Sequence, residues 1–125
     1  MKKVLVVALG GIVGSLGRWG ISLLIVERGF PWATLLVNYT GSSFLIGLLL
    51  YAKHHKDEKW WWRPALGSGL AGGFTTYSTF ALKVDRYFEA GNYLSALEYA
   101  AASLIGTYLL VVITHELLKN KWVSR

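Results

Sequence analysis

The sequence predicts an all-α membrane protein with four transmembrane helices per subunit. Of its 125 residues, 54% are hydrophobic and 16% are charged, whereas soluble domains carry about 25% charged residues. The apolar residues form four blocks, at about 4–26, 31–52, 65–82 and 93–117, and the charged residues lie mostly between them. Each block is near the roughly 20 residues that cross a bilayer as a helix. We therefore expect one transmembrane domain over residues 1–125, too small to enclose a wide pore without an oligomer.

The composition also excludes several classes of function. The chain has no cysteine, which rules out disulfides and thiol chemistry. The segment from Gly67 to Gly72 matches the glycine spacing of a dinucleotide site, but it lacks the preceding strand that such a site needs. The basic pI of about 9.7 does not predict nucleic-acid binding, because the positive charges flank membrane blocks. We expect neither an enzyme nor a nucleotide-driven pump.

The first block combines regular glycines with one cation. It continues to Val26, beyond the roughly 7–15 apolar residues of a signal peptide, so we expect a retained helix. Glycines at every third position predict close packing against another helix: Gly11, Gly14, Gly17 and Gly20. An ionisable residue in a membrane block is a candidate functional residue. Arg18 therefore has two interpretations, a cation beside an ion passage or an anchor for carbonyls at a helix end.

The second block contains Asn38 among apolar residues. A side-chain amide in lipid needs a hydrogen-bond partner. One interpretation is a bond to a neighbouring helix, which is a common use of asparagine in membranes. The other is a donor that faces an anion, and Asn38 alone does not distinguish the two.

The third block contains the most informative segment of the chain, from Gly72 to Phe80. Two glycines, hydroxyl residues and aromatic rings interrupt an apolar stretch. A helix that breaks inside a bilayer must line a cavity or be buried in protein. We predict a break near Gly72–Thr76. Ring edges are positive and hydroxyls can donate, so these side chains suit an anion, although an aromatic core cluster is the alternative for the rings: Tyr77, Ser78, Thr79 and Phe80.

The fourth block carries hydroxyls at every fourth position, at Tyr99, Ser103 and Thr107. This spacing places them on one face of a helix. They predict a polar track through an apolar helix. The alternative is that each hydroxyl bonds a carbonyl of its own helix.

Lysine and arginine are distributed unevenly between the two ends of the blocks. With both termini on one side, nine cations lie on that side: Lys2, Lys3, Lys53, Lys56, Lys59, Arg63, Lys119, Lys121 and Arg125. Three lie on the other, at Arg28, Lys83 and Arg86. Because cytoplasmic loops carry the excess of positive charge, we expect a multi-pass protein of the cytoplasmic membrane with both termini inside.

The segment from Gly72 to Phe80 resembles the third-helix signature of the Fluc/CrcB fluoride channels. The segment from Thr34 to Gly41 resembles their second-helix signature. The glycine-rich first block with Arg18, and the hydroxyls of the fourth block, fit the same family. The resemblance covers nearly the whole chain, and it implies passive export of fluoride, which reduces fluoride toxicity.

The resemblance also implies an assembly and a set of site residues. It implies an antiparallel dimer in the lipid membrane with two fluoride pores, and a structural sodium ion at its centre held by the carbonyls of Gly72 and Thr75. The paired pore phenylalanines of the family correspond to Tyr77 and Phe80. Further pore residues of the family correspond to Asn38, Ser78 and the polar track of Tyr99, Ser103 and Thr107.

Three departures bear on this resemblance. Tyr77 stands where the family has phenylalanine, and Lys83 stands where a glutamate is expected. The one-sided charge argues against a subunit that inserts in both orientations, so we expect a heterodimer with a homologous subunit of opposite orientation, with a homodimer as the alternative. A non-conducting structural or regulatory subunit is a second hypothesis. A small multidrug exporter is a third, but the first block has no carboxylate before Glu27 to exchange protons.

Overall fold

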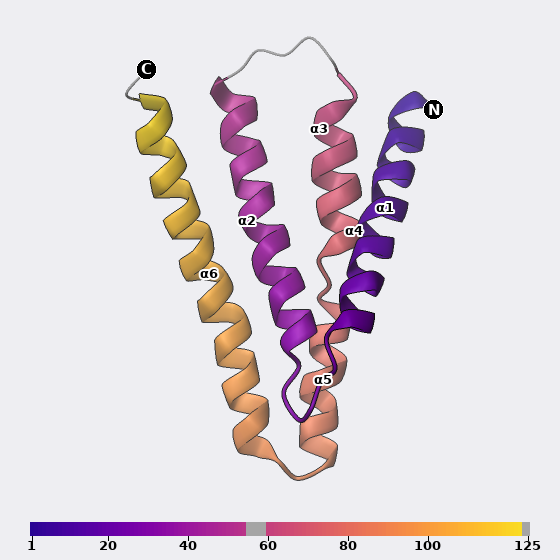
Figure 1. The fold of residues 1–125 in the computed structure, drawn as a ribbon, viewed down its shortest axis with the longest axis vertical. Coiled ribbons are helices and arrows are strands. Elements are labelled where there is room, and N and C mark those ends of the chain that lie inside the picture. The colour runs from indigo at the N-terminus through magenta and orange to yellow at the C-terminus, as the bar shows by residue number, and fades with distance from the viewer. Residues whose placement is uncertain (55–59, 124–125) are drawn as a thin grey trace.

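The computed structural model describes residues 1–54 and 60–123 (Figure 1). Every regular element in these two ranges is a helix, which confirms the all-α prediction. Three of the nine cations expected on the inner side, Lys56, Lys59 and Arg125, lie outside the described residues.

Three helices are long and apolar enough to cross a membrane. They are α1 (Lys2–Leu24), α2 (Trp32–His54) and α6 (Tyr93–Val123). They correspond to the first, second and fourth predicted blocks, and α6 continues past the end expected at residue 117. The protein is therefore a multi-pass membrane protein by the length and composition of its helices.

The third block is a segmented helix. Its parts are α3 (Trp62–Pro64), the π-helix η1 (Ala65–Ala71), α4 (Gly72–Phe74) and α5 (Ser78–Glu89). The break occupies residues 75–77, where Thr75 is extended with ψ 156°. The predicted break is thus present, but Gly72 and Gly73 themselves are helical. Moreover, α5 extends beyond the predicted end at residue 82, because its charged residues end the apolar pattern without ending the helix.

Glycines set the distance between α1 and the third block. A Cβ on Gly14 would lie 2.2 Å from the Leu70 carbonyl oxygen, and one on Gly73 would lie 2.4 Å from the Gly11 carbonyl oxygen. Since no side chain fits there, these glycines allow backbone-to-backbone packing, as the glycine stripe predicted. The stripe does not extend along the whole helix, because a Cβ on Gly20 would meet nothing within 4 Å. Gly73 serves this close contact rather than the break.

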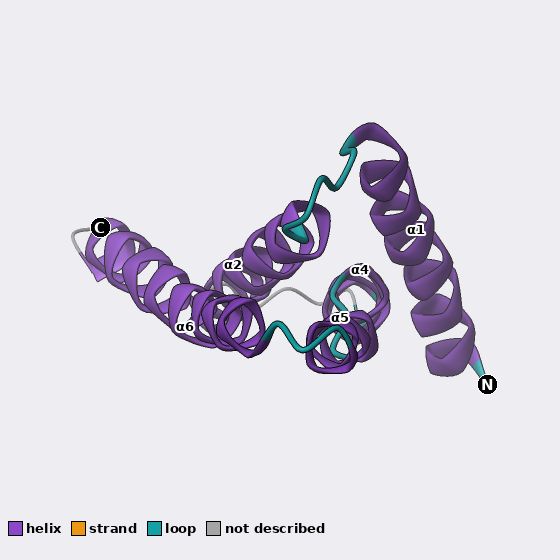
Figure 2. Ribbon diagram, turned by 90° about the horizontal axis from the view of Figure 1, so that it is seen from below, coloured by secondary structure: helices purple, strands orange, loops and turns teal. Residues whose placement is uncertain are grey.

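The helices form two packed groups (Figures 1 and 2). α1 packs on η1 and α4, while α2 and α5 pack on α6. The hydroxyl of Tyr39 on α2 donates to the Ala102 carbonyl of α6 over 2.5 Å, and a Cβ on Gly106 would overlap that hydroxyl. The N-terminus and the end of α6 lie at one end of the molecule, and the connections α1–α2 and α5–α6 lie at the other (Figure 1). The break, between α4 and α5, lies about halfway between these two ends (Figure 1).

The single chain buries few of its apolar side chains. Among the described residues, the largest fully enclosed side chains are those of Val37 and Tyr99, whereas many leucines, isoleucines and valines along α1 and α6 are exposed. Extended apolar surface on a soluble protein would mark a binding face. Here it belongs to helices long and apolar enough to cross a membrane.

Candidate functional site

The break in the third block is held by the side chain of Asn38. Its Nδ2 donates to the Thr76 carbonyl over 2.9 Å, and its Oδ1 accepts the Thr76 N–H over 2.8 Å. Both polar groups of the central residue of the break are thus satisfied by one amide from α2. Of the two interpretations of Asn38, the bond to a neighbouring helix is present. An amide nitrogen carries two donors, so one N–H of Asn38 is left after this pairing.

A carbonyl on the other side of the break is bound from α1. Arg18 Nε donates to the Gly73 carbonyl over 3.3 Å, and Ser15 Oγ lies 3.4 Å from the same oxygen. Arg18 therefore anchors a carbonyl next to a helix end, which was one of its two predicted roles. Because the cation is held at mid-height, it also places positive charge beside the break.

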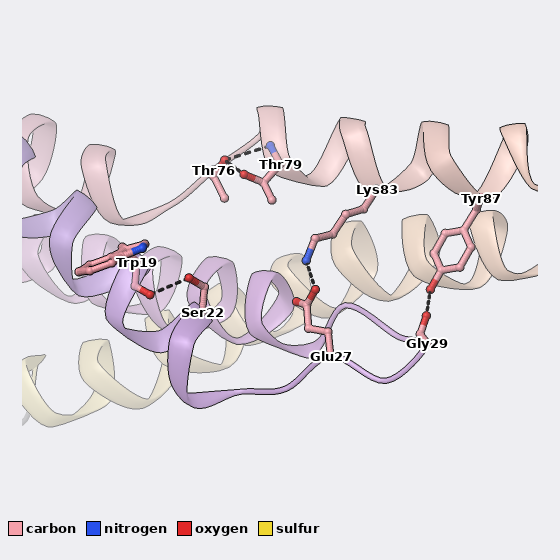
Figure 3. Close-up of polar contacts among 8 residues, drawn as sticks. All are labelled: Trp19, Ser22, Glu27, Gly29, Thr76, Thr79, Lys83 and Tyr87. Carbon is pink, nitrogen blue, oxygen red and sulfur yellow. Dashed lines mark hydrogen bonds and ion pairs between the residues drawn. The ribbon is translucent and has the colours of Figure 1, made fainter.

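The hydroxyl of Thr76 organises the start of α5. It accepts the Thr79 N–H over 3.1 Å and donates to Thr79 Oγ1 over 3.0 Å (Figure 3). Ser78 Oγ lies 3.3 Å from the same oxygen. A hydroxyl that accepts a first-turn N–H acts as an N-terminal cap. Thr76, at the centre of the break, thus caps the helix that follows.

These bonds divert the partners of two other carbonyls. In a continuous helix the carbonyl of residue i accepts from the N–H of residue i+4. The Thr76 N–H, which would pair with Gly72, goes to Asn38, and the Thr79 N–H, which would pair with Thr75, goes to the Thr76 hydroxyl. The carbonyls of Gly72 and Thr75 are therefore freed from the helical ladder. Carbonyl oxygens are the ligands that hard cations prefer, so the chemistry of this pair fits a sodium ion.

No group of three histidine, cysteine, aspartate or glutamate side chains within the described ranges could hold a metal ion.

A groove of about 390 Å³ opens on one side of the break. It brings together side chains from α2, the break, α5 and α6. Six of its lining residues were predicted as pore or ion-binding residues: Asn38, Thr75, Tyr77, Phe80, Ser103 and Thr107. Residues up to 69 positions apart in sequence are thus collected along one surface. Tyr77 is 77% exposed at its edge.

Aromatic rings and buried hydroxyls line up within this region. The Phe80 ring lies 5.7 Å from that of Tyr77 and 5.4 Å from that of Tyr99, measured between centroids. The side-chain oxygens of Tyr99 and Ser103 are buried, and the Tyr99 hydroxyl lies close enough to the hydroxyls of Ser103 and Thr34 to interact with them. The polar track of Tyr99, Ser103 and Thr107 therefore stays a prediction. Ser103 lines the groove and Tyr99 does not, so the Ser103 hydroxyl is the one available to a small polar occupant of the groove.

A second cavity, of about 500 Å³, lies between α1, α2 and α5, and we call it the polar cavity after the charged and hydroxyl side chains in its partly apolar lining. Its polar lining includes Ser15, Arg18, Glu27, Thr76, Thr79 and Lys83. Thr76 lines both this cavity and the groove. The two hollows therefore share one lining residue, the one that Asn38 holds.

Most of the predicted site residues are divided between the two hollows. Arg18 and Thr79 line the polar cavity rather than the groove. Three others line neither hollow, and of these Ser78 is exposed and Tyr99 is fully buried: Gly72, Ser78 and Tyr99. Sequence reasoning missed Thr76 and Ser15 as site residues. Ser15 is three positions before Arg18, on the same helix face, and that spacing was the available signal.

The chain resembles proteins of known function over most of its length. A family model described as "CrcB-like protein, Camphor Resistance (CrcB)" matches residues 5–115. The fluoride-specific ion channel FluC of Bordetella petrii is 41% identical over 110 residues, which are 87% of this chain and 85% of that protein. The FluC of Thermus thermophilus is 42% identical over 113 residues, 87% and 90% of the two chains. The FluC of Rhizobium meliloti is 40% identical over 116 residues, 90% and 91%.

Replacing Asn38 by leucine tests whether this amide holds the break. Asn38→Leu leaves the Thr76 N–H and carbonyl without partners, which costs about 1–3 kcal/mol for each group that stays buried. We expect a lower midpoint of thermal unfolding for the purified protein in detergent. Thr40→Val is the matched control, since the Thr40 hydroxyl bonds the Leu36 carbonyl of its own helix over 2.7 Å. Equal melting of Asn38→Leu and the control would refute the role assigned to Asn38.

Proposed function

The chain belongs to the CrcB-like family, and we propose that it is a subunit of a fluoride-specific ion channel that lets fluoride leave the cell passively. The observation that supports this most directly is the groove beside the break, because it collects the amide, the rings and the hydroxyls that an anion requires. The family consists of ion channels rather than enzymes. Membership in it also argues against the multidrug-exporter alternative.

Fluoride is small and holds its water strongly, so a pore must replace that water with firm donors, as any selectivity filter does. The groove offers the remaining N–H of Asn38 and the hydroxyls of Ser103 and Thr107. The rings of Tyr77 and Phe80 add positive edges, since the quadrupole of an aromatic ring is positive at its rim. We assign these five side chains to binding fluoride within the pore.

The electrostatics of the break favour an anion as well. α5 begins at Ser78, at mid-height in the molecule. The N-terminus of a helix carries a partial positive charge and free N–H groups, and half-helix ends of this kind bind anions in transporters. Arg18 adds a full positive charge one helix away. Both charges act in a surrounding of low dielectric constant, where they are weakly screened.

Phe80→Ile tests the assigned pore. The change keeps apolar bulk but removes the ring edge beside Tyr99 and Tyr77, so we expect fluoride efflux from proteoliposomes to fall at least tenfold. The matched control is Phe88→Ile on the same helix, because the Phe88 ring contacts Tyr93 and lies outside the groove. Efflux is measured with a fluoride electrode after an ionophore for the counter-cation is added, so that the charge of the departing fluoride is compensated.

Two outcomes would count against this assignment. Unchanged efflux in Phe80→Ile would remove Phe80 from the pore. Absence of efflux from the unaltered protein, alone and with a homologous subunit, would favour the non-conducting structural or regulatory role instead.

We further propose that the channel is an antiparallel dimer. The groove is open along one side, and Tyr77 is mostly exposed there. An ion cannot cross hydrocarbon along an open groove, because lipid offers no hydrogen bonds. A second subunit placed on this face would close the groove into a pore, and an antiparallel dimer would provide two such pores.

The same assembly supports a structural sodium ion. One subunit contributes the freed carbonyls of Gly72 and Thr75, and two oxygens are fewer than a hard cation requires. The corresponding pair from a second subunit would complete the set. When bound, the ion would supply a fixed positive charge at the dimer centre. In this chain the bonds of Asn38 and Thr76 hold the two carbonyls away from the helical ladder.

Removal of sodium tests this site. In a buffer whose only cation is a large organic amine, we expect the dimer to dissociate in detergent and its unfolding midpoint to fall. The reason is that the four carbonyls, two from each subunit, would lose the sodium ion that they coordinate together. Potassium chloride at the same ionic strength serves as the control for salt. Identical mass and melting in all three buffers would argue against a structural sodium ion.

The orientation of the subunit follows from its charge. Six of the cations on the side of the termini lie in the described ranges, at the ends of α1, α2, α3 and α6: Lys2, Lys3, Lys53, Arg63, Lys119 and Lys121. The ends of these helices share one side of the molecule (Figure 1). Such a bias fixes a single orientation. We propose that both termini are cytoplasmic and that the partner is a homologous subunit of opposite orientation.

Mapping the termini of the chain expressed alone tests this proposal. We expect reporters of cytoplasmic location at both ends to be active and periplasmic reporters to be silent, because positive loops are retained inside. Conduction should then require coexpression of the oppositely oriented homologue. A purified homodimer with mixed orientation that passes fluoride would contradict the heterodimer and leave the channel function intact.

A further inference from the structure

An ion pair joins the connection between α1 and α2 to α5. Lys83 Nζ donates to Glu27 Oε2, and the two side chains are 19% and 28% exposed (Figure 3). One helical turn further along α5, the Tyr87 hydroxyl donates to the Gly29 carbonyl of the same connection. The two contacts together fix the position of the Lys83 ammonium group.

This ion pair stands between two hollows. Glu27 and Lys83 line the polar cavity, which reaches Arg18 and the break. They also line an outer pocket of about 340 Å³ at the end of the molecule, formed with Phe30, Arg86 and Tyr87. Along α5, Thr79 lies toward the break and Tyr87 toward the end of the molecule, with Lys83 between them (Figure 3). An ion that moves between the outer pocket and the break through the polar cavity therefore passes Lys83.

The charges of the polar cavity are few. Its lining contains three charged side chains, namely the cations Arg18 and Lys83 and the anion Glu27. The cavity is therefore positive overall, and Glu27 cancels part of the field at its mouth. Because both members of the pair are largely covered by protein, their field is less screened than that of a surface pair.

We propose that Lys83 attracts fluoride at the mouth of the polar cavity and that Glu27 positions its ammonium group while weakening its field. This inference rests on the proposed channel function and adds an entry step to it. A hollow lined by charge of one sign concentrates the opposite ion and raises its rate of arrival by about tenfold or more at low ionic strength. Glu27 and Lys83 thus act in opposite directions on the arrival of the anion, although they form one ion pair.

The test compares two charge-neutralising variants in proteoliposomes that carry the assembled channel. At low ionic strength and low fluoride, we expect Lys83→Gln to lower efflux about threefold to tenfold and Glu27→Gln to raise it by a similar factor. Both differences should shrink in about 0.5 M potassium gluconate, because salt screens the field. At saturating fluoride both variants should approach the unaltered rate, since entry then ceases to limit conduction. Lys83→Arg should keep the original rate.

Arg28→Gln is the control for loss of one positive charge, because Arg28 belongs to the same connection but lines neither the polar cavity nor the outer pocket. Thermal unfolding of each variant reports the structural contribution of the ion pair, which both neutralising variants break.

Equal loss of efflux in Lys83→Gln and Glu27→Gln would show that the pair only holds the α1–α2 connection against α5, and would overturn the entry role. Efflux unaffected by either, in a channel that Phe80→Ile still blocks, would overturn it as well. An unaltered channel without efflux would overturn the channel function and this inference together.

Discussion

The structure depends on one constraint, which is that main-chain polar groups exposed by a broken helix inside a membrane must find partners. Hydrocarbon supplies none. Asn38 satisfies the N–H and the carbonyl of Thr76, Arg18 and Ser15 bind the Gly73 carbonyl, and the Thr76 hydroxyl receives the Thr79 N–H. The break is therefore an element with defined bonds to three different segments. A polar passage can then exist beside it without unfolding the span.

The groups that stabilise the break include those to which we assign a role in the passage of the anion. Asn38 keeps one N–H after it has bound Thr76, and Arg18 keeps its charge after it has bound Gly73. The N-terminus of α5, with its partial positive charge, lies at the break, about halfway between the two ends of the molecule. Structural and functional roles of these residues therefore do not exclude one another, and a variant such as Asn38→Leu affects both. For this reason the efflux and the stability of each variant have to be measured together.

Close packing around the break explains how the polar side chains that bind it are positioned. Gly14 and Gly73 allow α1 to contact the third block through backbone atoms, so that Arg18 reaches across a short distance. η1 is a π-helix, a form that occurs often at functional sites. On the other side, the groove is incomplete within one chain, and Tyr77 faces outward. The side of the third block that faces α1 is thus closely packed within the chain, whereas the groove on its other side is open.

The sequence alone determined the membrane class, the number of apolar blocks, the break and the hydroxyl and aromatic residues near it. These features are local, because hydropathy over about 20 residues, or a glycine–hydroxyl run, is visible without knowing the neighbours in space.

Only the tertiary structure decided how the main-chain groups of the break find hydrogen-bond partners. The bonds between Asn38 and Thr76 span 38 positions, and the pairing of Glu27 with Lys83 spans 56. Likewise, α5 continues past the apolar pattern because packing on α6 and contacts with the α1–α2 connection support a charged helix that hydropathy does not reveal. Such pairings are fixed by the packing of whole helices, which no local pattern specifies.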